Sequence, residues 1–264
     1  MFTLAAHVSW FKCEPYDKFR EAEKRKFKAI EMLKWFDLDL ERAKKEIERT
    51  GVEIPAVMVG SDSPQKMQIL KESGGIVSQD AHALFLEAFR ETVRAARILG
   101  ARNIVVTTGN EINGMPRARQ HGNIVQALRA AAPWAEDAGI QIVLEPLNVL
   151  VDHKGYYLST TAESVEIIRE VDSPAVRILY DIYHQQITEG NLIHNIRSNI
   201  EYIGHFHAAD VPGRHQPGTG EINYRNVFKA IRDTGFDGTV AFECILSEDV
   251  DKVCPKVWEL LDFD

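Results

Sequence analysis

Short apolar runs rich in β-branched residues alternate with amphipathic stretches along the chain. The apolar runs predict eight strands, over residues 2–8, 27–33, 52–60, 103–109, 140–146, 175–181, 202–210 and 238–244. Between them, apolar residues recur at helical spacing, for example over residues 83–100 and 123–139. Both stretches end in a glycine (Gly100 and Gly139), the residue that most easily adopts the left-handed conformation after a helix. The pattern therefore predicts alternating strands and helices.

The repeat length and the strand composition indicate the architecture. The chain has 264 residues, so eight strands leave 33 residues for each, the size of a strand with its crossover helix. The strands are apolar almost without interruption, which is typical of a parallel sheet covered on both faces. We therefore predict an α/β fold, a single (β/α)8 TIM barrel forming one domain over residues 1–264. An open doubly wound sheet is the alternative, but no GxGxxG turn follows any predicted strand.

The composition limits the classes of binding partner and the cellular compartment that we expect for this protein. With 31 Lys and Arg against 39 Asp and Glu, the net charge is −8, which disfavours nucleic acid or an anionic membrane as the partner. No run of about 18 apolar residues exists, and the first residues lack the apolar core of a signal peptide. We expect a soluble, cytoplasmic protein. Three cysteines without CxxC spacing argue against a disulfide framework and a thiolate zinc site.

Four successive predicted strands, the fifth to the eighth, end at ionisable residues. These are Glu145, Asp181, the pair His205 and His207, and Glu243. In a barrel of this type the functional groups lie at the carboxyl ends of the strands. One such carboxylate is readily explained by a neighbouring arginine, but several at one barrel mouth repel each other unless a cation holds them. The sequence therefore predicts a metal site there.

The donor types indicate which metal this site prefers. We predict Glu145, Asp181, His207 and Glu243 as ligands, a mainly oxygen-donor set that suits Mn²⁺ or Mg²⁺ before Zn²⁺, with Co²⁺ able to substitute. No organic cofactor is expected. Side chains alternate along a strand, so His205 and His207 face the same side and spacing alone does not choose between them. His207 lies nearer the carboxyl end, so we expect it to be the ligand and His205 to be a buried, hydrogen-bonded barrel residue.

Several segments, in order along the chain, resemble the xylose isomerase-like TIM barrel superfamily of sugar phosphate isomerases and epimerases. They are EPLN (145–148), GYYL (155–158), DIYH (181–184), GHFHAADVPGRHQPGTGEINY (204–224) and FEC (242–244). The match is closest to hydroxypyruvate isomerase-type and ketose 3-epimerase-type enzymes and is weaker before residue 100. His207 matches the epimerases, where hydroxypyruvate isomerases often have Gln. Val151 departs from the epimerases, which have a second Glu at that position.

The resemblance implies an activity and a mechanism. It implies a divalent-metal-dependent isomerase or epimerase of a ketose or small hydroxy-carbonyl compound, with the same four metal ligands. An enediolate would form and Glu145 and Glu243 would be the acid/base pair. Returning the proton to the opposite face of the same carbon gives epimerisation, and returning it to the adjacent carbon gives isomerisation; both remain open. The resemblance further implies a small-molecule substrate and a homo-oligomer, a dimer or tetramer.

Four further residues are predicted to bind substrate. His184 and Arg214 resemble family residues that contact substrate oxygens, and a guanidinium can hold a pair of oxygens in a fixed fork. His7 and Asn110 end the predicted strands one and four, where side chains line the pocket of a barrel.

Three alternative functions remain. A metal-dependent dehydratase acting on an inosose-type substrate would use the same ligands, with His184 as the additional acid. A non-catalytic barrel would bind metal or sugar without turnover. DIYH also resembles the strand-six motif of endonuclease IV-like DNA repair enzymes, but the −8 charge and the single-metal inventory oppose that activity.

Overall fold

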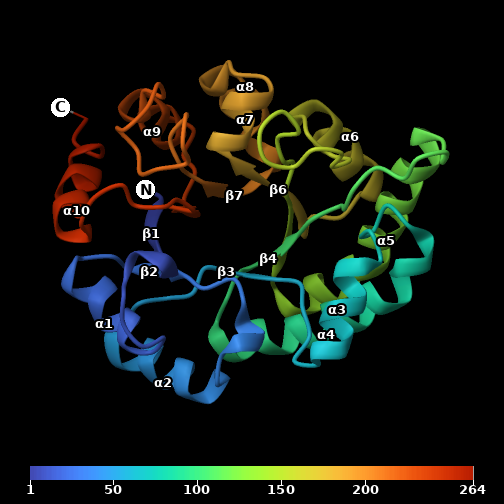
Figure 1. Ribbon diagram of the computed structural model, residues 1–264, viewed down its shortest axis with the longest axis horizontal. Helices are drawn as coiled ribbons and strands as arrows, with labels where there is room; N and C mark the ends of the chain where they lie inside the picture. Colours follow the sequence, from blue (N-terminus) through green and yellow to red (C-terminus); the bar gives the residue numbers. More distant parts are fainter. Residues whose placement is uncertain (264) are drawn as a thin grey trace.

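The computed structural model describes residues 1–263, in which eight parallel strands are surrounded by helices (Figure 1). The strands are β1 (Thr3–His7), β2 (Ala29–Glu31), β3 (Ala56–Met58), β4 (Asn103–Val106), β5 (Gln141–Leu144), β6 (Val176–Asp181), β7 (Ile203–His207) and β8 (Thr239–Ala241). Their order in the sheet is β2-β1-β8-β7-β6-β5-β4-β3. The predicted (β/α)8 TIM barrel is therefore confirmed, and every strand lies within its predicted run.

The barrel closes between β2 and β3 by a short contact instead of a ladder. Ala29 forms a single parallel bridge with Glu53, the residue three positions before β3. The amide of Ile30 donates to the carbonyl of Glu53 at 2.9 Å, and the amide of Met58 donates to the carbonyl of Leu33 at 2.9 Å. The sheet is thus nearly closed at this position.

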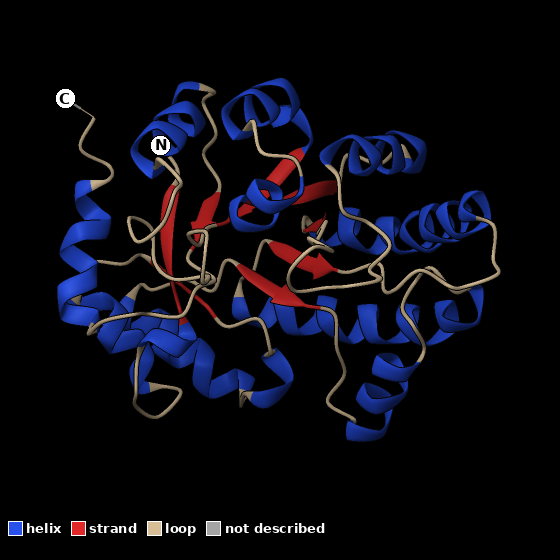
Figure 2. Ribbon diagram, turned by 45° about the horizontal axis from the view of Figure 1, so that its top comes forward, coloured by secondary structure: helices blue, strands red, loops and turns tan. Residues whose placement is uncertain are grey.

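The helices cover the outer face of the strands (Figure 2). They are α1 (Asp17–Lys24), α2 (Leu40–Thr50), α3 (Pro64–Glu72), α4 (His82–Leu99), α5 (Arg117–Ala138), α6 (Thr161–Val171), α7 (Ile182–Thr188), α8 (Leu192–Asn199), α9 (Tyr224–Asp233) and α10 (Val250–Glu259). Short 3-10 turns are η1 (Val8–Trp10), η2 (Trp35–Asp37), η3 (Gln79–Ala81) and η4 (Ile200–Tyr202). Gly100 (φ 71°) and Gly139 (φ 65°) end α4 and α5 in the left-handed conformation, as predicted.

Helix α5 begins at Arg117, earlier than the apolar pattern that starts at residue 123. The apolar pattern does not predict the first turns of this helix because the side chains that they bury are polar. Gln120 is fully buried, accepts a hydrogen bond from the amide of Ile112 at 2.8 Å and donates to the carbonyl of Met115 at 2.9 Å. A pattern of apolar residues cannot detect a helix face whose buried residues are polar.

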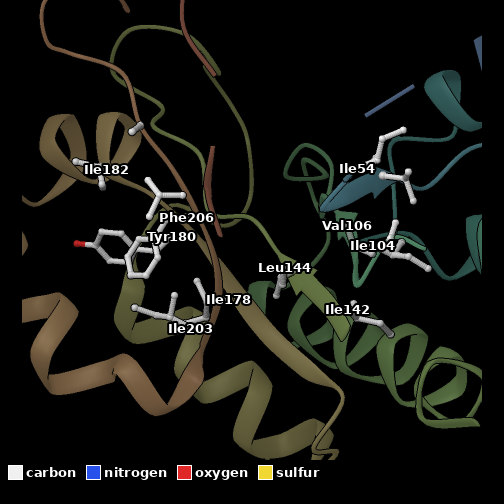
Figure 3. Packing of buried hydrophobic residues seen from close by; sticks show 14 of the residues in the cluster. Ile54, Ile104, Val106, Ile142, Leu144, Ile178, Tyr180, Ile182, Ile203 and Phe206 are labelled. Carbon is white, nitrogen blue, oxygen red and sulfur yellow. The ribbon is translucent and has the colours of Figure 1, made fainter. Parts of the chain in front are cut away.

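The main core lies between the strands and the helices. Alternate residues of each strand face outward into it, among them Ile104, Ile142 and Ile178, all fully buried (Figure 3). On β6 and β7, Tyr180 and Phe206 pack with ring centroids 5.8 Å apart. Residues of the opposite parity fill the barrel interior as two small clusters. They are Ala5, Ala29 and Ala241 on β1, β2 and β8, and Ala56, Val105, Val143 and Leu179 on β3 to β6.

Candidate metal and acid/base site

The four predicted metal ligands come together at the carboxyl ends of the last four strands. Glu145 follows β5 directly, Asp181 and His207 are the last residues of β6 and β7, and Glu243 lies two residues beyond β8. One potential ligand atom from each of the four lies within 4.8 Å of the others. Strand periodicity explains this convergence, because each residue lies two positions beyond an inward-facing interior residue or histidine of its strand.

His207 occupies the centre of this group. Its Nδ1 lies 3.5 Å from Oε1 of Glu145 and 3.3 Å from Oε2 of Glu243. The Nδ1 atom and Oδ2 of Asp181 are both buried and lack a hydrogen-bond partner among the described residues. Buried polar atoms are nearly always paired, so two unpaired ligand atoms facing one space indicate a missing partner.

The two glutamates have opposite electrostatic environments. Burial raises the pKa of Glu145, and the nearby charges of Glu243 and Asp181 raise it further against the opposing effect of His207. Burial would also raise the pKa of Glu243, but the positive charges of His207 and Arg214 outweigh it and lower that pKa. Burial would lower the pKa of His207, but the charges of Glu31 and Glu243 raise it well above its ordinary value.

Arg214 lies in the loop between β7 and α9 and reaches into the group of acids. One guanidinium nitrogen lies 2.5 Å from Oε2 of Glu243 and 3.6 Å from Oδ2 of Asp181, and the guanidinium carbon lies 5.1 Å from the ring centre of Tyr183. Without a bound cation, the positive charges facing these carboxylates come from Arg214 and His207. The predicted role of Arg214 in binding substrate stays a prediction.

Asp210 holds the loop that carries Arg214. This fully buried carboxylate accepts hydrogen bonds from the amides of Val211, Gly218, Thr219 and Ile222, at 2.8–3.1 Å. Gly220 packs so closely that a Cβ atom there would lie 2.0 Å from the carbonyl oxygen of Val211. The loop is therefore fixed by the chain itself, which limits the entropy lost when Arg214 contacts a ligand.

His184 is fully buried, and its two ring nitrogens have different roles. The Nδ1 atom accepts a hydrogen bond from the side-chain amide of Asn148 at 2.7 Å, so a neutral ring carries its hydrogen on Nε2. That Nε2 lies 3.5 Å from Oδ2 of Asp181 and has no hydrogen-bond partner among the described residues. Asp152 accepts hydrogen bonds from Asn148 (2.8 Å) and from the hydroxyl of Tyr183 (2.9 Å).

His7 and Asn110, the other two predicted substrate-binding residues, are placed differently. His7 ends β1 and lines the same cavity as Glu145 and Glu243, with Nδ1 2.7 Å from the hydroxyl of Ser9. Asn110 is exposed, is not among the residues that line that cavity, and forms a bridge with Tyr156. Strand β4 ends at Val106, and Thr107 directly after it lines the cavity instead, so the strand end was predicted too late.

Glu31 belongs to the site but was not predicted from the sequence. This fully buried residue ends β2, and its Oε1 lies 2.9 Å from Nε2 of His205 and 3.1 Å from Nε2 of His207. Burial would raise its pKa, but both histidines lower it below the ordinary range. The signal was present, since Glu31 ends a buried strand two residues after the inward-facing Ala29. His205 is the buried, hydrogen-bonded residue that was predicted.

A cavity of about 1150 Å³ extends from the two glutamates over the first half of the barrel. Its wall is mostly apolar and comes from the loops that follow β1 to β4 and from α3. The apolar lining includes Met32, Leu33, Phe36, Met58, Leu70 and Val105. Glu145 and Glu243 both line this cavity, so a small molecule bound there would touch both acids.

Comparison with known proteins identifies the family. Residues 19–254 match the family model of the xylose isomerase-like TIM barrel. The chain belongs to the xylose isomerase-like TIM barrel family. Hydroxypyruvate isomerase of Escherichia coli (strain K12) is 30% identical over 251 residues, which cover 92% of this chain and 93% of that protein. A 2-oxo-tetronate isomerase of Cupriavidus necator is 33% identical over 148 residues, 56% of each chain. The predicted superfamily and the predicted likeness to hydroxypyruvate isomerases are therefore confirmed.

Solved structures support the same fold. A protein titled AP endonuclease, family 2, from Brucella melitensis superposes with a TM-score of 0.88 at 23% identity, covering 98% of this chain and 99% of that one. A D-psicose 3-epimerase superposes with a TM-score of 0.81 at 20% identity, covering 99% and 98%. At these identities the likeness shows the fold alone. The isomerase relatives within the family confirm the prediction of an enzyme of the isomerase type. Within residues 1–263, no helix is long and apolar enough to cross a bilayer.

Proposed function

We propose that this protein is a divalent-metal-dependent isomerase or epimerase of a ketose or small hydroxy-carbonyl compound, with hydroxypyruvate as the first substrate to test. One observation carries the proposal: three carboxylates and an imidazole converge within 4.8 Å at the edge of a cavity. The relatives named hydroxypyruvate isomerase and 2-oxo-tetronate isomerase supply the substrate class. We also retain the expectation of a cytoplasmic homo-oligomer.

The residues present fit a divalent cation. Nδ1 of His207 and Oδ2 of Asp181 are buried, unpaired and face the same space as the two glutamates. Three carboxylates beside one imidazole favour Mn²⁺ or Mg²⁺, with Co²⁺ as a substitute. When bound, the cation would polarise two adjacent substrate oxygens and offset the charge of the three acids.

The two glutamates provide the proton transfers. Their pKa values are displaced in opposite directions, which is the arrangement of an acid/base pair in which one member holds the proton and the other accepts it. Glu243 would remove the proton from the carbon beside the substrate carbonyl, and Glu145 would return a proton to the enediolate. Return to the opposite face of that carbon gives an epimer, and return to the adjacent carbon gives the isomer.

Arg214 and His184 are proposed to orient the substrate. Arg214 already contacts Glu243 and can donate to a substrate oxygen beside that acid. His184 presents Nε2–H toward Oδ2 of Asp181, the same oxygen that Arg214 approaches. His7 lines the cavity from β1 and is the third proposed contact, whereas the position of Asn110 gives no support for a fourth.

The test is proton NMR in D₂O with metal-free protein reloaded with Mg²⁺ or Mn²⁺ and supplied with hydroxypyruvate and a panel of ketoses. The proposal expects deuterium at the carbon next to the carbonyl of one substrate, and none without metal. The position of the label distinguishes epimerisation from isomerisation. Metal-independent exchange, or none with any member of the panel, would contradict the proposal.

A dehydratase remains the second candidate because of His184. Its Nε2 is buried and unpaired among the described residues and lies close to Asp181, where it could protonate a departing hydroxyl. Mass spectrometry separates the two activities, since a dehydratase product is lighter than its substrate by one water and an isomerase product is not.

A further inference from the structure

We propose that Glu31 is a positioning residue that fixes the ring of His207, so that this histidine, and not His205, meets the cation through Nδ1. The inference rests on the proposed metal-dependent function and assigns it a residue outside the four ligands. It also links the only acid at the end of β2 to a site built by β5 to β8.

The hydrogen bonds around Glu31 determine the orientation of both histidines. Its Oε1 lies 2.9 Å from Nε2 of His205 and 3.1 Å from Nε2 of His207. A carboxylate oxygen can only accept, so both Nε2 atoms carry hydrogen and are directed away from the acids of the site. For His207 this leaves Nδ1 facing Glu145 and Glu243, at 3.5 and 3.3 Å.

Small residues make room for this contact across the barrel interior. Strand β2 neighbours β1 and not β7, so Glu31 has to reach across the barrel to touch the histidines. Ala5, Ala29 and Ala241 pair in register on β1, β2 and β8, and all are at most 1% exposed. Larger side chains at these inward-facing positions would occupy the interior that Glu31 and His205 fill.

Position along β7 separates the roles of the two histidines, since both make the same kind of bond to Glu31. His205 lies two residues before His207 on β7, farther from the carboxyl end of the strand. It is fully buried and is not among the four groups that gather at the cavity. His207 is the one whose second nitrogen reaches them. A carboxylate behind a metal-binding histidine fixes ring orientation and strengthens the ligand, and losing it weakens metal binding about 10–100-fold.

The experiment compares Mn²⁺ binding with folding in three variants, by calorimetric titration and thermal melting of the metal-free proteins. Glu31→Gln keeps an acceptor oxygen but loses the charge, and Glu31→Ala removes both. We expect the Mn²⁺ affinity to fall about tenfold in the first and about a hundredfold in the second. His205→Asn is the matched control: it disturbs the same buried bond and should lower the melting temperature while leaving the Mn²⁺ affinity within about threefold.

The outcomes separate this inference from the proposed function. If Glu31→Gln and Glu31→Ala bind Mn²⁺ as the wild type does, Glu31 is only structural, although the proposed function stands. If His205→Asn loses as much affinity as Glu31→Ala, the distinction between the histidines fails. Two Mn²⁺ per wild-type chain would indicate that Glu31 and the histidines hold an ion themselves, which overturns the inference. No Mn²⁺ binding by the wild type overturns both proposals. Should Glu31→Ala not fold, Glu31→Asp, which keeps the charge but is one methylene shorter, replaces it with the same expected direction.

Discussion

The two halves of the barrel differ in what their strand ends carry. Strands β5 to β8 each deliver an ionisable group to the mouth, and these groups lie within 4.8 Å of one another. The ends of β3 and β4 instead deliver apolar residues such as Met58 and Val106 to the cavity wall. One half of the barrel therefore supplies the groups proposed to react, and the other supplies the apolar wall that shapes the cavity.

Electrostatics explains why the charged groups are concentrated in one half. A buried carboxylate is costly unless positive charge or hydrogen bonds compensate it. Here His207 and Arg214 provide that charge to several acids at once, and a bound cation would add to it. Distributing the acids around the whole rim would require a separate partner for each one.

The largest expected effect comes from Glu243→Gln. Losing this carboxylate removes a proton acceptor and a ligand charge, so we expect turnover of the substrate to fall about a hundredfold to ten-thousandfold. The measurement is the steady-state rate, with circular dichroism to show that the fold is intact. The control is Glu248→Gln in the same loop, where the side chain pairs with Lys256 outside the site. Near-normal turnover in Glu243→Gln would rule out the two-carboxylate mechanism.

His207→Asn tests which of the two histidines on β7 is the metal ligand. It should reduce the metal content by at least tenfold, because a ligand nitrogen is lost, and it should also lower the melting temperature of the metal-free protein, because it breaks the buried bond to Glu31. His205→Asn should lower the melting temperature but leave the metal content nearly unchanged, since the buried hydrogen bond that it breaks lies away from the site. Metal analysis by mass spectrometry and thermal melting measure the two effects. The opposite pattern would mean that the ligand was misassigned.

The pH dependence of metal binding sharpens the comparison further. The neighbouring acids raise the pKa of His207, so below that pKa the ring holds two protons and must release the one on Nδ1 to bind a cation. The affinity for Mn²⁺ should therefore rise with pH, by up to about tenfold per unit, and level off above that pKa. Titrations at several pH values measure the slope. His207→Asn should weaken this dependence to the part that the raised pKa of Glu145 contributes, and an affinity that falls with pH would contradict the expectation.

The smallest effect is expected in the apolar half, for Met58→Ala. This side chain lines the cavity beside β3 and contributes surface but no charge. Shortening it should raise KM a few-fold and leave kcat and the Mn²⁺ affinity unchanged, because an apolar wall binds substrate and transition state alike. A large loss of kcat would show that this wall also takes part in the chemistry.

Most of the fold could be predicted from the sequence because strand and helix periodicities are repeated along the chain. The four convergent groups were predictable for the same reason, since each ends an apolar run. Glu31 was missed because Met32 and Leu33 continue the apolar run beyond it, so it does not end its run and metal ligands were expected only on the last four strands. Its position two residues after the inward-facing Ala29 is the signal that could have found it. Asn110 was assigned to the pocket because the apolar pattern extends past Val106, where the hydrogen-bonded strand ends.

Contacts made by loops were harder to predict. Asp152 lies next to Val151, the position at which the epimerases have their second glutamate, and its bonds to Asn148 and Tyr183 depend on how the loop after β5 turns. Val151 itself is 68% exposed. No spacing rule indicates that an adjacent residue supplies a carboxylate near the site.

The incomplete ladder between β2 and β3 has a consequence for how the molecule opens. Between the other neighbouring strands parallel ladders hold the backbone, whereas here one bridge and a few amide bonds close the barrel. Amides at this seam should therefore exchange with deuterated solvent sooner than those joining β5 to β6. Since Glu31 follows Ile30 directly at the seam, local opening there would momentarily release the imidazoles it holds, and a bound ion should slow that exchange.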